Sequence, residues 1–368
     1  MAYRLEEIVY PVDARRPCTR PVCPGYSLLV PRFSPTTMSD LFVHAVQTLL
    51  LATHLVCVNV SMCGPLVCLW LDRRQRRRGD PAAAVAARLL ADWSLWLLIV
   101  GTLLGLALGM LHWWSGNELF FAALTRLSGK VTFGVWEILF SLVCLGLYAW
   151  GWRAPRQRLA WRVVHQSLAV LGTTNLLYHF PLLFGVITQL QVNGQTRGDE
   201  IDASEFRHLM MDGEVLATTL HVWIAALATA GVALMVIGVR RPDAGDAGEF
   251  RPVIAWGARI ALAATLLQIP SGVWLMTHLT QGRLDQLLGG DALGTLMFLG
   301  ALVATFGLLH LLSAIAMRNN DRNSARNAIG LFLAIVLLMS GTRTSATSAQ
   351  QQTLPPGEGS SVSIGVDQ

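Results

Sequence analysis

Five side chains in apolar stretches of the sequence have the chemistry to bind a metal or to move a proton. They are His54, Glu137, His179, His221 and Met297. Imidazole and thioether groups bind transition metals, and a carboxylate or an imidazole can accept and release protons. A carboxylate inside a membrane costs roughly 2–3 kcal/mol or more unless it is paired or protonated. Each group therefore needs a partner, and the elements that carry these residues decide which partner they meet.

Composition places those elements in a membrane. Of the 368 residues, 53% are hydrophobic and only 14% are charged, whereas a soluble domain of this size carries more charge. An apolar run longer than eighteen residues crosses a hydrocarbon layer of about 30 Å as a helix, because a helix satisfies its own backbone hydrogen bonds. The sequence predicts an all-α fold, a polytopic transmembrane helix bundle. Its eight expected spans are residues 41–71, 88–111, 131–152, 161–190, 213–239, 253–279, 291–317 and 327–342.

Arginines set the expected orientation. The connections at 71–81, 153–162, 240–251 and 318–326 hold fifteen arginines, whereas the three connections on the other side hold five basic residues. The positive-inside rule predicts that the arginine-rich side is cytoplasmic and that the N-terminus is periplasmic. This distribution explains the net charge of +5 without a nucleic-acid partner. If the short eighth span does not cross, only the C-terminal tail changes side.

The two ends of the chain differ from the helical domain expected at 39–342. Residues 1–38 form a proline-rich arm that is expected to be extended outside the membrane, and they lack the continuous apolar segment of a signal peptide. Residues 343–368 form a polar tail of low complexity that is expected to be disordered. The six cysteines form neither a disulfide ladder nor a zinc pattern.

The five candidate side chains fall in one layer near the outer face. Counting about twenty residues outward from each charged inner end gives His54 and His221 the same depth. The same count puts Met297 at the outer edge and Glu137 and His179 in the outer third. Imidazole or thioether ligands from facing helices, inside an apolar box, are what a haem requires.

Each residue also has a plainer interpretation. A single histidine inside a membrane is often a hydrogen-bonded core residue, and a single methionine often fills a gap. Glu137 can equally serve as a structural hydrogen-bond partner. Three glycines in the second span form two overlapping G-x-x-x-G units, which are expected to allow close helix packing; they are Gly101, Gly105 and Gly109.

The order of these features resembles subunit I of the cytochrome bd oxidases. The segment "THLVCVNVSMCGPLVCLWLDRRQRRRGDP" is similar to that family's first helix, with its histidine and a basic loop that ends in Gly-Asp-Pro. The segments "GTLLGLALGM", "VWEILFSLVCLGLYAWGW", "LAVLGTTNLLYHFP" and "TTLHVWIAALATAGVALMVIG" are similar to its second to fifth helices. The resemblance covers residues 41–317.

The resemblance implies a set of haem ligands. In that family the first-helix histidine, here His54, binds a haem of the oxygen-reducing pair. The fifth-helix histidine and a seventh-helix methionine, here His221 and Met297, hold a low-spin b-type haem; Met297 is assigned by depth alone. Glu137 or His179 would handle protons or haem propionates. One or two haems b are expected, and the residues give no support for haem d.

The sequence also departs from that family. Its third helix carries two glutamates, whereas this chain offers only Glu137. The segment 280–291 is far too short for the family's quinol-binding loop, and the terminal glutamate ligand and the Gly-Arg-Gln-Pro-Trp segment have no counterpart. Quinol oxidation at the usual site is therefore not expected.

The first functional hypothesis is a haem b-binding electron-transfer subunit of a respiratory complex in the bacterial inner membrane. It would belong to an oxidoreductase, and it would contribute to oxygen reduction if the haem on His54 keeps an open coordination position. Its expected partners are a second membrane subunit and a periplasmic cytochrome c or other donor. The acidic loop at 194–208 is either a dock for a positively charged cytochrome or, more simply, a solvated loop. The alternative is a haem-free multi-pass transporter or scaffold with a polar cavity near the outer face. A third hypothesis is an interaction subunit that has lost its cofactors.

Overall fold

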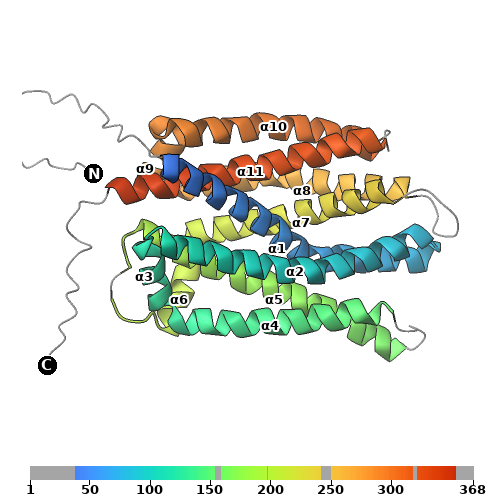
Figure 1. Ribbon diagram of the computed structural model, residues 1–368. Coiled ribbons are helices and arrows are strands. Elements are labelled where there is room, and N and C mark those ends of the chain that lie inside the picture. The colour runs from blue at the N-terminus through green and yellow to red at the C-terminus, as the bar shows by residue number, and fades with distance from the viewer. Residues whose placement is uncertain (1–37, 154–158, 197, 242–249, 318–320, 354–368) are drawn as a thin grey trace, which may run out of the picture.

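The structure is a computed structural model that describes residues 38–153, 159–196, 198–241, 250–317 and 321–353 (Figure 1). The described part of the chain is helical. Its elements are α1 (Met38–Arg78), α2 (Pro81–Trp114), α3 (Glu118–Arg126), α4 (Ser128–Gly151), α5 (Leu159–Val192), α6 (Ala203–Met210), α7 (Gly213–Arg240), α8 (Arg251–His278), α9 (Gln281–Asp285), the π-helical turn η2 (Gln286–Gly290), α10 (Ala292–Met317) and α11 (Arg322–Thr353).

Eight of the described helices are long and apolar enough to cross a membrane, which confirms the predicted fold class and number of spans. They are α1, α2, α4, α5, α7, α8, α10 and α11. The helix α11 continues through Thr353, beyond the boundary expected at residue 342. The arm at 1–37 and the end of the tail at 354–368 lie outside the described residues.

The long helices form four sequential hairpins, α1–α2, α4–α5, α7–α8 and α10–α11 (Figure 1). The helix α1 also contacts α5, α7 and α11, and α7 also contacts α5 and α11. In α1 and in α7, 61% of the most apolar 18-residue stretch is buried, whereas in α2 and in α10 only 17% of that stretch is buried. Thus α1 and α7 are inner helices of the bundle, and they carry His54 and His221.

Small side chains explain the inner position of α1. Cys57, Ser61, Gly64 and Cys68 recur every three or four residues and so share one face of the helix. On that face, Cys68 Sγ donates to the carbonyl oxygen of Ala87 in α2 at 3.2 Å. Because these side chains are short, the backbones of α1 and α2 approach closely over much of their length.

Two of the three glycines predicted to allow close packing do so. A methyl group on Gly101 would lie 2.8 Å from Val58 Cγ1, and one on Gly105 would lie 3.0 Å from His54 Cε1. Gly109 has no atom within 4 Å of such a methyl group among the described residues. The prediction is therefore confirmed for Gly101 and Gly105 and is wrong for Gly109.

The reversal between α1 and α2 follows from the local sequence Gly-Asp-Pro. Gly79 adopts a φ of +66°, which a residue with a Cβ rarely does. Asp80 then caps α2 by accepting a hydrogen bond from the Ala83 amide, and Pro81 takes the first helical position, where no amide proton is needed. The α1–α2 turn, with the arginines that end α1, lies at the same end of the bundle as the C-terminal ends of α4, α7 and α10, and α3, α6 and α9 gather at the other end (Figure 1).

Candidate functional site

His54 lies on α1 and faces the glycine-bearing side of α2. Its Nδ1 is 2.8 Å from the carbonyl oxygen of Gly101. A carbonyl oxygen can only accept a hydrogen bond, so Nδ1 carries the proton in this contact. The ring also lies directly against Gly105, where a methyl group would come within 3.0 Å of Cε1. Gly101 thus anchors the imidazole and Gly105 makes room for it.

His221 lies on α7 and faces α8, where its partners are polar side chains. Ser271 Oγ donates to the backbone carbonyl oxygen of Gln268 at 3.1 Å, so its single proton is used there. Ser271 Oγ therefore accepts a hydrogen bond from His221 Nδ1, at 3.1 Å. The amide nitrogen of Gln268 then donates to the free lone pair of His221 Nε2, at 3.2 Å. Both nitrogens of His221 have partners on one turn of α8.

The two histidines consequently share a tautomer. Each directs its Nδ1 proton to the neighbouring helix of its own hairpin, so each neutral ring keeps its lone pair on Nε2. They differ at that nitrogen. The described residues offer no hydrogen-bond partner to Nε2 of His54, whereas Gln268 covers Nε2 of His221. A ligand could therefore bind Nε2 of His54 without breaking a hydrogen bond, whereas at His221 it would have to displace Gln268.

Met297 lies on α10 with its sulfur against Gly341 of α11. The structure thus places Met297 against α11 and His221 against α8. Methionine has three rotatable side-chain bonds, so its sulfur can take several positions about a fixed backbone. A role of Met297 as an axial ligand remains a prediction.

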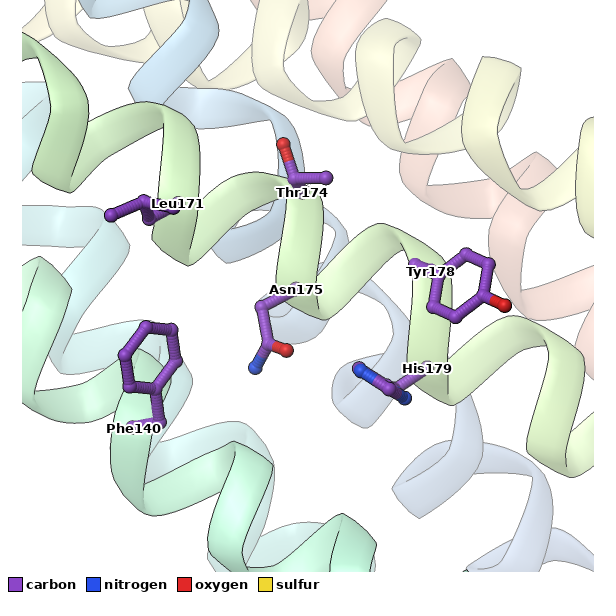
Figure 2. A pocket seen from close by; sticks show the side chains of 6 residues that line it. All are labelled: Phe140, Leu171, Thr174, Asn175, Tyr178 and His179. Carbon is purple, nitrogen blue, oxygen red and sulfur yellow. The ribbon is translucent and has the colours of Figure 1, made fainter.

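Glu137 and His179 are brought together between α4 and α5. His179 Nε2 is 3.9 Å from Glu137 Oε2, and both side chains are largely buried, with exposed fractions of 28% and 16%. Beside them is an open pocket of about 220 Å³. Figure 2 shows its lining, which consists of Phe140 from α4 and Leu171, Thr174, Asn175, Tyr178 and His179 from α5.

Asn175 joins the two helices at this pocket. Its Nδ2 donates to the carbonyl oxygen of Glu137 at 2.9 Å and to Ser141 Oγ at 2.8 Å. Both acceptors lie on α4, so one amide group fixes the height of α5 relative to Glu137. The imidazole of His179 and the amide of Asn175 line the pocket, and the Glu137 carboxylate lies next to that imidazole. Such a group can hold or pass a proton, or bind a polar group.

Three other histidines have local structural partners. His165 is buried, with its Nε2 2.9 Å from the carbonyl oxygen of Tyr148. His112 stacks on Phe120 with ring centroids 5.0 Å apart. His278 Nδ1 is 3.0 Å from the carbonyl oxygen of Trp274, one turn back on its own helix. These contacts are those of ordinary structural histidines.

The described residues hold no group of three or more His, Cys, Asp or Glu side chains that could bind a metal ion. A haem needs only one or two protein ligands, because the macrocycle supplies the others. The donor chemistry of His54 and His221 fits such a group, since each ring keeps its lone pair on Nε2. The ring of His54 packs against Gly105 with no hydrogen-bond partner on Nε2 among the described residues, and at His221 the Gln268 amide would have to move away.

Three residues of these sites were not found from the sequence: Ser271, Gln268 and Asn175. The local signals were the polar interruptions Gln-Ile-Pro-Ser-Gly at 268–272 in the sixth span and Thr-Thr-Asn at 173–175 in the fourth. The pairing of the first interruption with His221 depends on how α7 and α8 are rotated about their axes, which no local pattern specifies.

No protein-family model matches the chain, and no curated protein sequence matches it. Among solved structures, the fold is similar to that of the bd oxidase from Geobacillus thermodenitrificans. The TM-score is 0.58 at 13% sequence identity, and the match covers 84% of this chain and 87% of that one. The similarity shows that the chain shares the helical arrangement of a bd oxidase chain.

Proposed function

We propose that the chain is a membrane electron-transfer subunit of a respiratory oxidase-like complex and that it binds b-type haem through His54 and His221. The observation that carries this proposal is the matching state of the two imidazoles. Each ring gives its Nδ1 proton to a neighbouring helix, which leaves on Nε2 the lone pair that iron requires. Their location on the two inner helices of a fold similar to that of a bd oxidase supports the same proposal.

The residues around each ring have separate roles in this proposal. The Gly101 carbonyl and Ser271 Oγ hold the imidazoles in place by accepting their Nδ1 protons, and the surrounding apolar helices exclude water. Met297 is the proposed second ligand of the haem on His221. Glu137 and His179 are proposed to hold a proton or a haem propionate. A bound haem would supply one-electron transfer, with a potential set by ligand identity, burial and hydrogen bonding.

We place the protein in a bacterial inner membrane with the arginine-rich end in the cytoplasm and the N-terminus in the periplasm. A second membrane subunit is the proposed partner. The acidic loop was a candidate dock for a periplasmic cytochrome c, but two of its carboxylates have internal partners. Glu200 accepts hydrogen bonds from Ser128 and Gly129, and Asp202 caps α6.

The test is a reduced-minus-oxidised spectrum of the purified chain and of its His54→Ala and His221→Ala variants. We expect haem bands in the wild type and the loss of a distinct set of bands in each variant. His310→Ala is the matched control, because His310 is exposed on α10, and its spectrum should equal that of the wild type. The proposal would be refuted by a wild-type chain without Soret absorption, or by spectra of both variants that equal the wild-type spectrum.

The haem-free alternative, a transporter or scaffold, is favoured by one observation. Both ring nitrogens of His221 already have protein partners, as in a structural core histidine. The open pocket between α4 and α5, which Asn175 and His179 line together with apolar side chains, would then be its functional cavity. A transporter of this kind would show no redox-sensitive absorption, and the Asn175→Leu and His179→Ala variants would lose transport while His54→Ala would retain it.

A further inference from the structure

The turn of α8 that faces His221 holds two polar side chains with different functions. Ser271 is buried, with an exposed fraction of 5%, and its oxygen lies between the Gln268 carbonyl and His221 Nδ1. Because its own proton is committed to the carbonyl, Ser271 can only accept from the ring. This arrangement admits the Nδ1-protonated imidazole and disfavours the Nε2-protonated one.

Gln268 covers the other ring nitrogen. Its amide nitrogen donates to His221 Nε2 at 3.2 Å, while its amide oxygen Oε1 is buried without a hydrogen-bond partner. A buried polar atom without a partner raises the free energy of the conformation that contains it. The Gln268 side chain therefore has a reason to leave this position once another group binds Nε2.

We propose that Ser271 and Gln268 are positioning residues for His221: Ser271 locks the tautomer that can bind iron, and Gln268 is a cap that an incoming iron displaces. This inference rests on the proposed function, since it requires His221 to be a haem ligand. In the haem-free chain the protein itself thus covers Nε2 of His221, whereas Nε2 of His54 has no hydrogen-bond partner among the described residues.

The two residues have opposite effects on haem binding. Ser271→Ala removes the acceptor that orients the ring, and loss of such a partner lowers affinity by about 10- to 100-fold. Gln268→Leu removes the competing hydrogen bond and should raise affinity roughly 2- to 10-fold. A purely structural role would lower affinity in both variants. Gly272→Ala is the matched control, because a methyl group there would lie at an ordinary 3.5 Å from His221 Cε1.

Haem affinity is measured by titrating the purified full-length haem-free chain with haemin and recording the Soret band. The midpoint potential of the bound haem is the second readout. An imidazole that loses the acceptor on Nδ1 becomes a weaker electron donor, so Ser271→Ala should raise the potential. Gly272→Ala should leave both readouts unchanged.

The haem-free chain provides a third readout, the tautomer of His221. In protein carrying ¹⁵N-labelled histidine, the His221 signals are those lost in His221→Phe. We expect a protonated Nδ1 and an unprotonated Nε2 in the wild type, and a mixture of tautomers in Ser271→Ala. A protonated Nε2 in the wild type would overturn this inference.

The outcomes separate this inference from the proposed function. If the wild type binds haem while Ser271→Ala and Gln268→Leu both leave affinity and potential unchanged, the inference is overturned and the proposed function stands. If the wild type takes up no haem at all, the proposed function is overturned, and the ligand role of His221 with it.

Discussion

The α1–α2 and α7–α8 hairpins each present a histidine to the neighbouring helix, but they use glycine for different purposes. In α1–α2 the glycines receive side chains, because Gly101 lies against Val58 and Gly105 against the His54 ring. In α7–α8 they bring backbone against backbone: a methyl group on Gly231 would lie 2.8 Å from the Gly257 carbonyl oxygen. His221 lies away from that crossing and depends on polar side chains.

This difference shows that a close helix contact does not by itself make a site. At α7–α8 the close contact holds the hairpin together, and the surroundings of His221 are set by Ser271 and Gln268 ten or more residues further along α8. At α1–α2 the close contact is the site, since the same glycine surface packs the helices and accepts the imidazole. Substitutions should therefore separate stability from ligand binding in one hairpin and not in the other.

The largest expected effect is at the backbone crossing of α7 and α8. In Gly257→Ala the methyl group would lie 2.8 Å from the Met235 amide nitrogen, and backbone cannot move aside as a side chain can. We expect a loss of about 3 kcal/mol in the free energy of unfolding, measured by unfolding in detergent micelles. Gly109→Ala is the control, since it meets no atom among the described residues. Equal stability of the two variants would contradict the assignment.

The next effect is at His54. Gly105→Ala pushes against a ring that is held by its hydrogen bond to Gly101, so we expect a loss of about 2 kcal/mol in unfolding free energy. If haem binds there, its affinity should fall about 10-fold with it. Gly272→Ala, the equivalent change beside His221, should change neither the unfolding free energy nor the haem affinity. A Gly105→Ala variant with unchanged stability and affinity would remove the contrast between the hairpins.

A third hairpin, α4–α5, extends the comparison to a contact made by an amide. Asn175→Leu removes two hydrogen bonds and leaves the buried Ser141 hydroxyl without its donor. We expect a loss of about 1 kcal/mol in unfolding free energy and a change in the environment of Glu137, visible as a shifted carboxyl band in infrared difference spectra. Thr174→Val, in the same pocket but exposed, should leave both unchanged.

The smallest effect is outside the membrane, where a carboxylate instead of a glycine fixes a helix end. The Gly129 amide and the Ser128 hydroxyl donate to Glu200, and they hold the pKa of its carboxyl below the ordinary value. Because the folded pKa is lower than the unfolded one, this contact stabilises the fold at neutral pH and is lost as the pH falls through the folded pKa.

Hydrogen exchange at the Gly129 amide measures that loss. After correction for the intrinsic rate, exchange should accelerate as the pH falls from 7 to 3. In Glu200→Gln the Gly129 amide should already be as weakly protected at pH 7 as it is in the wild type at pH 3. Glu205→Gln, a neighbouring exposed carboxylate that pairs with Arg126, is the control and should not change Gly129. Protection that does not vary with pH would show that Glu200 does not hold the start of α4.

Much of the fold was predictable because hydropathy is a local property. The eight apolar runs became eight long helices, and Gly-Asp-Pro at 79–81 became a turn and a helix start. The short helices α3 and α6 in the outer connections were not predicted, since eight or nine residues give too weak a periodic signal to separate from a loop.

The sequence by itself determined that this is a helical membrane protein, where its histidines lie along the helices, and which connections carry the positive charge. Only the tertiary structure decided what each histidine meets. His54 meets a glycine surface forty-seven residues away, and His221 meets a serine fifty residues away. Such pairs depend on the rotation and axial shift of one helix against another, and these are fixed by the packing of whole faces, which no single stretch of sequence contains.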